Sequence, residues 1–296
     1  MRWEDERQSD NVEDRRGQGG GFGGVAMRRG GIGIGTIVLA LLGGWLLGIN
    51  PLVILGLNGG VDGGPAVQAP AQSAPGQSGV SPADPGGRFV STVLASTEDT
   101  WTEVFRQGGA QYRPPRLVMF SGATQTACGL GQSAAGPFYC PEDETVYIDL
   151  SFYQMLQKRF KAPGDFAQAY VVAHEVGHHV QNLLGTMSKM QSQRQRMSER
   201  QYNQLSVRLE LQADCYAGIW ARQSQQAKGW LEQGDVEEGL NAASQIGDDT
   251  MQKRSQGTVV PDAFTHGSSK QRVYWFRVGM ESRQLSDCDT FVRTEP

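Results

Sequence analysis

The most apolar stretch of the chain runs from residue 32 to residue 57, is rich in Ile, Leu, Val and Gly, and contains no charged residue. A helix of about 20 such residues spans the hydrocarbon core of a bilayer, so this pattern predicts one transmembrane helix. Arg28 and Arg29 precede the stretch, and the next basic residue after it is Arg88. Because basic residues collect on the cytoplasmic side, we expect a single-pass protein with a cytoplasmic N-terminus and an extracytoplasmic remainder.

A cleaved signal peptide is the alternative for this stretch. Signal peptides have an apolar core of about 7–15 residues and a cleavage site of small residues close behind it. Here the core is longer, and Ala69-Pro70-Ala71 lies far downstream and contains proline. We therefore expect an uncleaved anchor in the lipid bilayer. Gly44 and Gly48 match the GxxxG pattern of paired membrane helices and would permit a homodimer, although the many nearby glycines make a chance match the simpler explanation.

Both flanks of this predicted helix are polar and lack an apolar period. Residues 1–31 are charged and glycine-rich, which predicts a disordered cytoplasmic tail. Residues 58–87 consist mainly of Gly, Pro, Ala, Gln and Ser, a composition typical of a flexible linker. The remaining segment, 88–296, is long enough for one hydrophobic core, so we expect a single extracytoplasmic domain there.

Periodic patterns within residues 88–296 predict an α+β fold that is mainly helical and contains a small sheet. Runs of β-branched and aromatic residues predict strands at 117–120 and 145–150. Apolar residues at three- to four-residue spacing predict helices at 91–105 and 151–160. Strand 145–150 could present an edge to an extended peptide, or it could be an ordinary internal strand, and the pattern leaves both open.

Two further helices are expected later in the chain. Asp165 is placed to cap the first, with Gln168 completing a capping box. The apolar run that follows predicts a helix to about Leu184, where Gly185 ends it. The second helix is indicated by apolar residues that recur at steps of three and four, namely Tyr202, Leu205, Leu209, Ala213, Tyr216 and Trp220.

The first of these helices carries the sequence HEVGH at 174–178. Two histidines four residues apart project from one face of a helix and can bind one Zn²⁺. Glu175 points to the side, where it can take a proton from an attacking water. This division of roles is typical of HExxH zinc peptidases, so we expect one zinc ion, with Glu175 as the general base. His179 lies about 100° around the helix from the preceding histidine and is expected to belong to the core or to support a ligand.

A catalytic zinc needs a third protein ligand and one open position. With His174 and His178 as the first two ligands, Glu210 on the second helix is the leading candidate for the third. Asp214, four residues later, would accept the free N–H of a ligand histidine and orient its ring. The alternatives are that both acids face solvent, as most helical acids do, or that His266 is the third ligand.

His266 lies in a polar Thr-His-Gly segment and could act on the bound substrate instead. It would then donate a hydrogen bond to the oxyanion of the tetrahedral intermediate, and Arg272 nearby could do the same. A lone histidine in a polar loop is more often structural, so the pattern leaves both interpretations of His266 open.

The cysteines and the charge bear on the compartment and on partners. Cys128 and Cys140 flank a glycine-rich loop suited to a local disulfide, and Cys215 could then pair with Cys288, one of three connectivities that four cysteines allow. Such pairing is expected if the domain is extracytoplasmic. The net charge is −4 and no basic face or aromatic-basic motif is visible, so no nucleic-acid partner is expected.

Several of these motifs together resemble one known family, the bacterial putative neutral zinc metallopeptidases. The resemblance covers nearly the whole chain apart from 58–87 and 186–201. It is carried by RW at 2–3, NVEDRRG at 11–17, GPFYCP at 136–141, GDFA at 164–167, HEVGHH at 174–179, ELQADCYAG at 210–218, FTHG at 264–267 and CDTF at 288–291. It implies a single-pass protein of the inner membrane with an outward zinc-dependent domain.

The wider pattern, HExxH followed by ExxxD, is similar to the gluzincin class of peptidases, in which the later Glu is the third ligand. We therefore expect a zincin-like endopeptidase that acts on peptides or proteins of the cell envelope. Two alternatives stay open, namely a zinc-binding envelope protein without hydrolytic activity, such as a chaperone or assembly factor, and a structural anchor in which the motif has no chemical role.

Overall fold

The computed structural model describes residues 1–17, 77–158, 160, 162, 164–282 and 284–293. The predicted transmembrane helix 32–57 and most of the predicted linker lie outside these residues. None of the helices in the described ranges combines the length and the apolar character that a membrane span requires.

A five-stranded sheet forms one layer of the domain, with the strand order β2-β1-β3-β7-β6. Its three central strands run parallel, and both edge strands are antiparallel to their neighbours. The strands are β1 (Val12–Asp14), β2 (Gln77–Ser78), β3 (Arg116–Phe120), β6 (Phe138–Cys140) and β7 (Thr145–Asp149), and a separate hairpin is formed by β4 (Ala123–Thr126) and β5 (Gly129–Gln132). The predicted strands at 117–120 and 145–150 are thus confirmed. The idea that 145–150 is an edge is wrong, because β7 is paired on both sides.

The predicted disordered tail is wrong for residues 1–17, which are folded against the domain. Strand β1 inserts between β2 and β3, and its Val12 is paired with Leu117 and is only 2% exposed. Arg7 reaches two acids of helix α3 (Pro85–Gln107), with Nη2 at 3.1 Å from Glu98 and 2.7 Å from Asp99. Charges that look solvated in the sequence are therefore paired with groups about ninety positions away.

This packing bears on the predicted membrane topology. A bilayer cannot separate two strands that hydrogen-bond to each other, as β1 and β3 do. A cytoplasmic N-terminus combined with an extracytoplasmic domain therefore does not agree with the fold. Residues 18–31, the rest of the predicted tail, lie outside the described residues.

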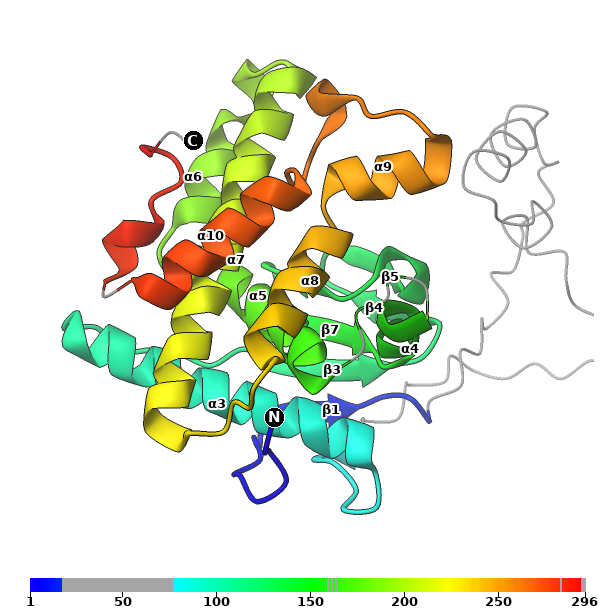
Figure 1. The fold of residues 1–296 in the computed structure, drawn as a ribbon, viewed down its shortest axis with the longest axis vertical. Coiled ribbons are helices and arrows are strands. Elements are labelled where there is room, and N and C mark those ends of the chain that lie inside the picture. Colours follow the sequence, from blue (N-terminus) through cyan, green and yellow to red (C-terminus); the bar gives the residue numbers. More distant parts are fainter. Residues whose placement is uncertain (18–76, 159, 161, 163, 283, 294–296) are drawn as a thin grey trace, which may run out of the picture. The chain divides into compact units, whose positions relative to one another are not determined.

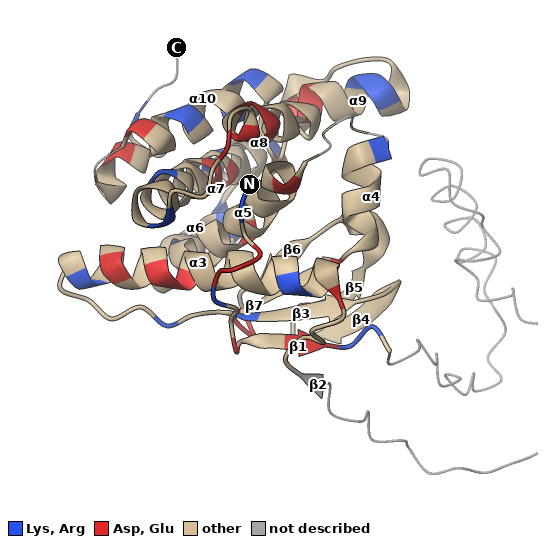
Figure 2. Ribbon diagram, turned by 60° about the horizontal axis from the view of Figure 1, so that its bottom comes forward, with Lys and Arg blue, Asp and Glu red and all other residues tan. Residues whose placement is uncertain are grey.

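Helices cover one face of the sheet (Figure 2). They are α3 (Pro85–Gln107), α4 (Ser151–Lys158), α5 (Asp165–Leu183), α6 (Thr186–Gln193), α7 (Glu199–Lys228), α8 (Asp235–Gln245), α9 (Asp248–Gln256) and α10 (Ser269–Glu281). All four predicted helices are present. The α+β class with mostly helical content is confirmed. Helix α5 is central, since it packs against β6 and β7 and also against α3, α7 and α8 (Figure 1).

Two helix starts differ from the sequence-based expectation. Helix α3 begins at Pro85 because the Asp84 carboxylate accepts a hydrogen bond from the Gly87 N–H at 3.1 Å, so the domain begins before residue 88. Asp165 is the first residue of α5 and not its cap, because its carboxylate accepts from the indole N–H of Trp3 at 3.1 Å. The end of α5 is as predicted, with Gly185 in the left-handed region at φ 78°.

Glycines let three helices approach closely and thereby position the predicted ligands. A Cβ atom added at Gly177 of α5 would lie 3.0 Å from the Ala213 carbonyl of α7. A Cβ at Gly218 of α7 or at Gly279 of α10 would overlap backbone atoms of the other helix. Because α5, α7 and α10 touch at their backbones, side chains one turn away from these contacts can meet in a shared interior.

Candidate metal centre

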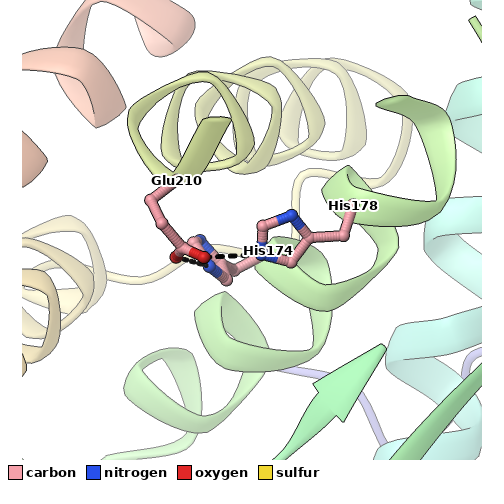
Figure 3. Close-up of side chains that lie close together, drawn as sticks. All are labelled: His174, His178 and Glu210. Atoms are coloured by element: carbon pink, nitrogen blue, oxygen red, sulfur yellow. Dashed lines mark hydrogen bonds and ion pairs between the residues drawn. The ribbon is translucent and has the colours of Figure 1, made fainter. Parts of the chain in front are cut away.

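Three side chains from two helices converge in the interior between α5 and α7. His174 and His178 project from α5, and Glu210 points toward them from α7 (Figure 3). The His174 Nε2 atom lies 3.1 Å from Glu210 Oε2, and the His178 Nε2 atom lies 3.4 Å from Glu210 Oε1. One ligand atom from each of the three residues lies within 4.8 Å of the others.

These distances suit a single tetrahedral zinc ion. With metal–ligand bonds of about 2.0–2.1 Å, ligand atoms in a tetrahedron are about 3.3 Å apart. Each histidine has one Glu210 oxygen near that distance, namely Oε2 at 3.1 Å from His174 and Oε1 at 3.4 Å from His178. Two imidazoles and one carboxylate are also the donor set of catalytic zinc sites that keep a fourth position open. The residues present therefore fit the ion.

A buried acid fixes the orientation of His174. Its Nδ1 atom lies 2.8 Å from Asp214 Oδ1, and Asp214 is fully buried. Asp214 also accepts from the Tyr170 hydroxyl and from Arg272 Nε and Nη2, the last two at 2.8 and 2.9 Å. Burial alone would raise the pKa of Asp214, but the Arg272 guanidinium and His174 lower it to about 2. The acid thus stays ionised, and with a metal at Nε2 it would hold the one remaining ring proton of His174 on Nδ1.

An amide does the same for His178. The Nδ1 atom of His178 lies 2.9 Å from Gln181 Oε1. The amide nitrogen of Gln181 donates to the Leu209 carbonyl at 2.7 Å and to Gln212 Oε1 at 3.1 Å, which sets its oxygen toward the histidine. Both histidines are therefore presented with Nε2 facing Glu210.

A cavity of about 590 Å³ opens onto this cluster. Glu175 lines it beside the two histidines and is itself only 8% exposed. Burial raises the pKa of the Glu175 carboxyl. His266 and Arg272 line the same cavity, so all the residues expected from the sequence to do chemistry share one space.

His266 stands apart from the metal-binding cluster. Among the residues that the structure describes, the group able to hold an ion contains Glu210 and not His266, which disfavours His266 as third ligand. Its Nδ1 atom lies 3.2 Å from Asp248 Oδ1, and this hydrogen bond raises the pKa of the imidazole. The other Asp248 oxygen accepts from the backbone N–H groups of Thr265, His266 and Gly267 at 2.6–3.0 Å. The loop is thereby held with the histidine at the cavity.

The sequence suggested that Arg272 could donate a hydrogen bond to the oxyanion, but in the structure its guanidinium binds Asp214. Its guanidinium is only 3% exposed and donates hydrogen bonds to Asp214. Arg272 therefore positions the acid that contacts His174. His179 lies in the core, which was one of the two places expected for it. It is fully buried, with Nδ1 at 2.9 Å from the Tyr139 hydroxyl and Nε2 at 2.7 Å from the Arg113 carbonyl.

Three residues of the site were missed by the sequence analysis. Tyr170 is four residues before His174, and Gln181 is three residues after His178, so helical spacing alone places both on the ligand face of α5. Asp248 carries no such signal, because it meets His266 only through the packing of α9 against the start of α10.

Both expected disulfides are present. Cys128 pairs with Cys140, and Cys215 pairs with Cys288. The second bond joins α7, five residues after Glu210, to the C-terminal segment. It is next to the ligand support, since the Gln212 amide donates to the Cys288 carbonyl at 3.1 Å.

An HExxH helix joined by a glutamate from a second helix is a ligand arrangement typical of zinc peptidases. The chain matches the family model described as "Putative neutral zinc metallopeptidase" over residues 1–291. It therefore belongs to that family.

The chain also matches curated relatives over most of its length. The chain is 49% identical to the uncharacterized protein YpfJ of Escherichia coli K12 over 296 residues, covering 98% of this chain and 99% of the relative. It is 41% identical over 214 residues to the uncharacterized protein Rv2575 of Mycobacterium tuberculosis H37Rv, covering 69% of this chain and 71% of that protein. No solved structure matches the chain.

Proposed function

We propose that the protein is a zinc-dependent endopeptidase with His174, His178 and Glu210 as the zinc ligands. The observation that carries the proposal is that these three side chains converge at zinc-binding distances in a cavity that also holds Glu175. Zinc, when bound there, would act as a Lewis acid and lower the pKa of water. Glu175 takes the proton of the attacking water and returns it to the leaving amine.

Three further residues complete the proposed chemistry. His266 donates a hydrogen bond from Nε2 to the oxygen of the attacked carbonyl as negative charge develops on it. Asp248 supports this role, because it holds the opposite ring nitrogen and the backbone of the loop. Asp214 keeps His174 in the tautomer that binds metal.

The edge strand β6 offers a track for an extended peptide. Among the described strands it pairs only with β7, and Gly136 to Tyr139 line the cavity. A peptide that adds to this edge would pass the zinc ligands with chain continuing in both directions, as an endopeptidase requires. The edge role that the sequence left open for strand 145–150 is thus proposed for β6.

The compartment is proposed from the disulfides and the apolar stretch. Two disulfide bonds favour an oxidising, extracytoplasmic environment for the domain. Residues 32–57 are proposed to contact the inner-membrane bilayer, and proteins or peptides of the envelope are the proposed substrates. Acidic and basic residues are interspersed over the helices (Figure 2). This distribution argues against a nucleic-acid partner.

The substitution Glu175→Gln tests the function. We expect the variant to keep the zinc content of the wild type and to lose at least about 100-fold in hydrolysis of a denatured protein substrate. Hydrolysis that survives this change would overturn the mechanism. A zinc-loaded wild type that cuts no member of a peptide library would favour the non-hydrolytic binding protein. A wild type that carries no zinc after purification without chelators would favour a structural anchor.

The third ligand has its own test. Glu210→Ala should lower zinc affinity by at least about 10-fold, whereas His266→Ala should leave it near that of the wild type. Competition with a chromophoric chelator measures both. The opposite result would make His266 the ligand.

A further inference from the structure

The cavity is chemically uneven around the proposed zinc ligands. One part of its wall is formed by apolar side chains from five segments: Phe152 and Met155 of α4, Phe160, Val171 of α5, Ile246, and Met251 of α9. From this wall we propose that the enzyme selects a bulky apolar side chain, aliphatic or aromatic, on the residue next to the scissile bond. The inference rests on the proposed peptidase function and names the class of its substrate.

Contacts place this apolar wall beside the reaction centre. Val171 lies one turn before His174, so both point from the same face of α5. The Ile246 carbonyl accepts from Arg272 Nη1 at 3.4 Å, and Nη2 of the same guanidinium donates to the Tyr170 hydroxyl at 3.1 Å. Ile246 is therefore held next to the same turn of α5.

The remaining part of the wall is closed by α9. The Arg254 guanidinium of α9 lies over the Phe160 ring at 5.6 Å, which joins the segment after α4 to this helix. Met251 faces the cavity from the same helix. A side chain bound against Val171 would thus be surrounded by carbon and sulfur on several sides.

Most charged groups of the cavity already have partners among the described residues. Arg272 is paired with Asp214, and the Asp248 carboxylate accepts from His266 and from three backbone N–H groups. Glu210 faces the two histidines, and Glu175 follows His174 directly in the chain, on the motif side of the cavity. None of these six wall residues carries a charge, so a charged substrate side chain placed against them would lose its hydration at a high cost.

The size of the cavity agrees with this assignment. At about 590 Å³ it falls within the range of sites that enclose a small ligand, so it can hold the reacting peptide group and one large side chain. Apolar pockets discriminate by roughly 10- to 200-fold between side chains of different apolar size. We expect at least a 10-fold preference in kcat/KM for Leu or Phe over Ala, Asp or Lys next to the cleaved bond.

The test uses the zinc-loaded full chain and a mixture of peptides, with cleavage sites mapped by mass spectrometry. Met251 is 40% exposed, so Met251→Lys should fold. It should lower cleavage next to Leu or Phe and raise cleavage next to Asp or Glu. Val259→Lys, at a 42% exposed position outside the cavity lining, controls for the added charge and should keep the wild-type preference.

The outcomes separate this inference from the proposed function. Cleavage by the wild type without any apolar preference, or an equal change in both lysine variants, would overturn the inference and leave the peptidase function standing. If the wild type cuts nothing, calorimetry with peptide hydroxamates decides, because binding needs no turnover. At least 10-fold tighter binding of the isobutyl than of the carboxymethyl hydroxamate would support the pocket, and equal binding would overturn it.

Discussion

Oδ1 of Asp214 lies 2.8 Å from Nδ1 of His174, although the two residues are forty positions apart and belong to different helices. Arg272 and Tyr170 bind the same carboxylate, so its position is set from three directions. Because a carboxylate at Nδ1 fixes the tautomer and raises the basicity of Nε2, this contact determines how well His174 can serve as a metal ligand.

Asp214→Asn should weaken zinc binding by about 10- to 100-fold while leaving all three ligands in place. The amide keeps the shape of the acid but lacks the charge that balances the buried Arg272 guanidinium, so the melting temperature should also fall. Chelator competition and thermal unfolding measure the two effects. Asp262→Asn, at a side chain that is 63% exposed, is the matched control and should change neither. Unchanged zinc affinity in Asp214→Asn would show that the acid does not support the ligand.

Helical periodicity was sufficient to predict the parts of the site that lie within single helices. The i, i+4 spacing of HExxH placed both histidines on one face, and the apolar stripe beside Glu210 indicated that this acid faces the interior. Neither inference required knowledge of distant contacts. The glycine contact at Gly177 and Ala213 then brings the two helices together.

Contacts between distant segments could not be predicted in the same way. Strand β1 has three residues, and Val12 is its only apolar one, so no alternation marks it as a strand. Its pairing with β3 joins positions more than one hundred residues apart. The meeting of Asp248 with His266 likewise depends on tertiary packing and leaves no local pattern.

The proposed peptidase activity should depend on pH through His266. The hydrogen bond with Asp248 raises the pKa of this imidazole, so the protonated, donating form persists above the ordinary histidine pKa of about 6.5. Activity should therefore fall as the pH rises through that raised pKa. In Asp248→Asn the pKa should drop, and the alkaline limb of the kcat/KM profile should move to lower pH.

The control for this profile is His266→Gln. It should lower kcat by about 100-fold or more and remove the alkaline limb that depends on the imidazole. If the alkaline limb persists unchanged in His266→Gln, the group that titrates there is not His266.

The disulfide between Cys215 and Cys288 should support both the fold and the metal site. Replacing both cysteines by serine opens a loop with a sequence separation of 73, which in the chain-entropy estimate costs about 4 kcal/mol of unfolding free energy. Zinc affinity should fall as well, because Gln212 connects the Cys288 carbonyl to Gln181, the residue that orients His178.

The other disulfide provides the comparison. Replacing Cys128 and Cys140, with a sequence separation of 12, should cost about 3 kcal/mol of unfolding free energy. It should leave zinc affinity unchanged, since this bond makes no contact with the described supports of the ligands. Equal losses of zinc affinity in the two double variants would contradict a specific role for Cys215 and Cys288.

The N-terminal segment should be part of the folded domain in the cell. Val12→Asp would bury an unpaired charge between β2 and β3 and should lower the unfolding free energy by about 3 kcal/mol or more, whereas Asp10→Ala, at an exposed position, should have little effect.

The same packing predicts the topology. Asp5 and Thr102 are both exposed, and the native cysteines are all in disulfides. Two variants, each with one added cysteine at position 5 or at position 102, should therefore react to the same extent with a membrane-impermeant maleimide on intact spheroplasts. Labelling at position 102 together with protection at position 5, released only by permeabilising the membrane, would mean that a bilayer separates the segments. In that case β1 could not pair with β3, and Val12→Asp should leave the stability of the domain unchanged.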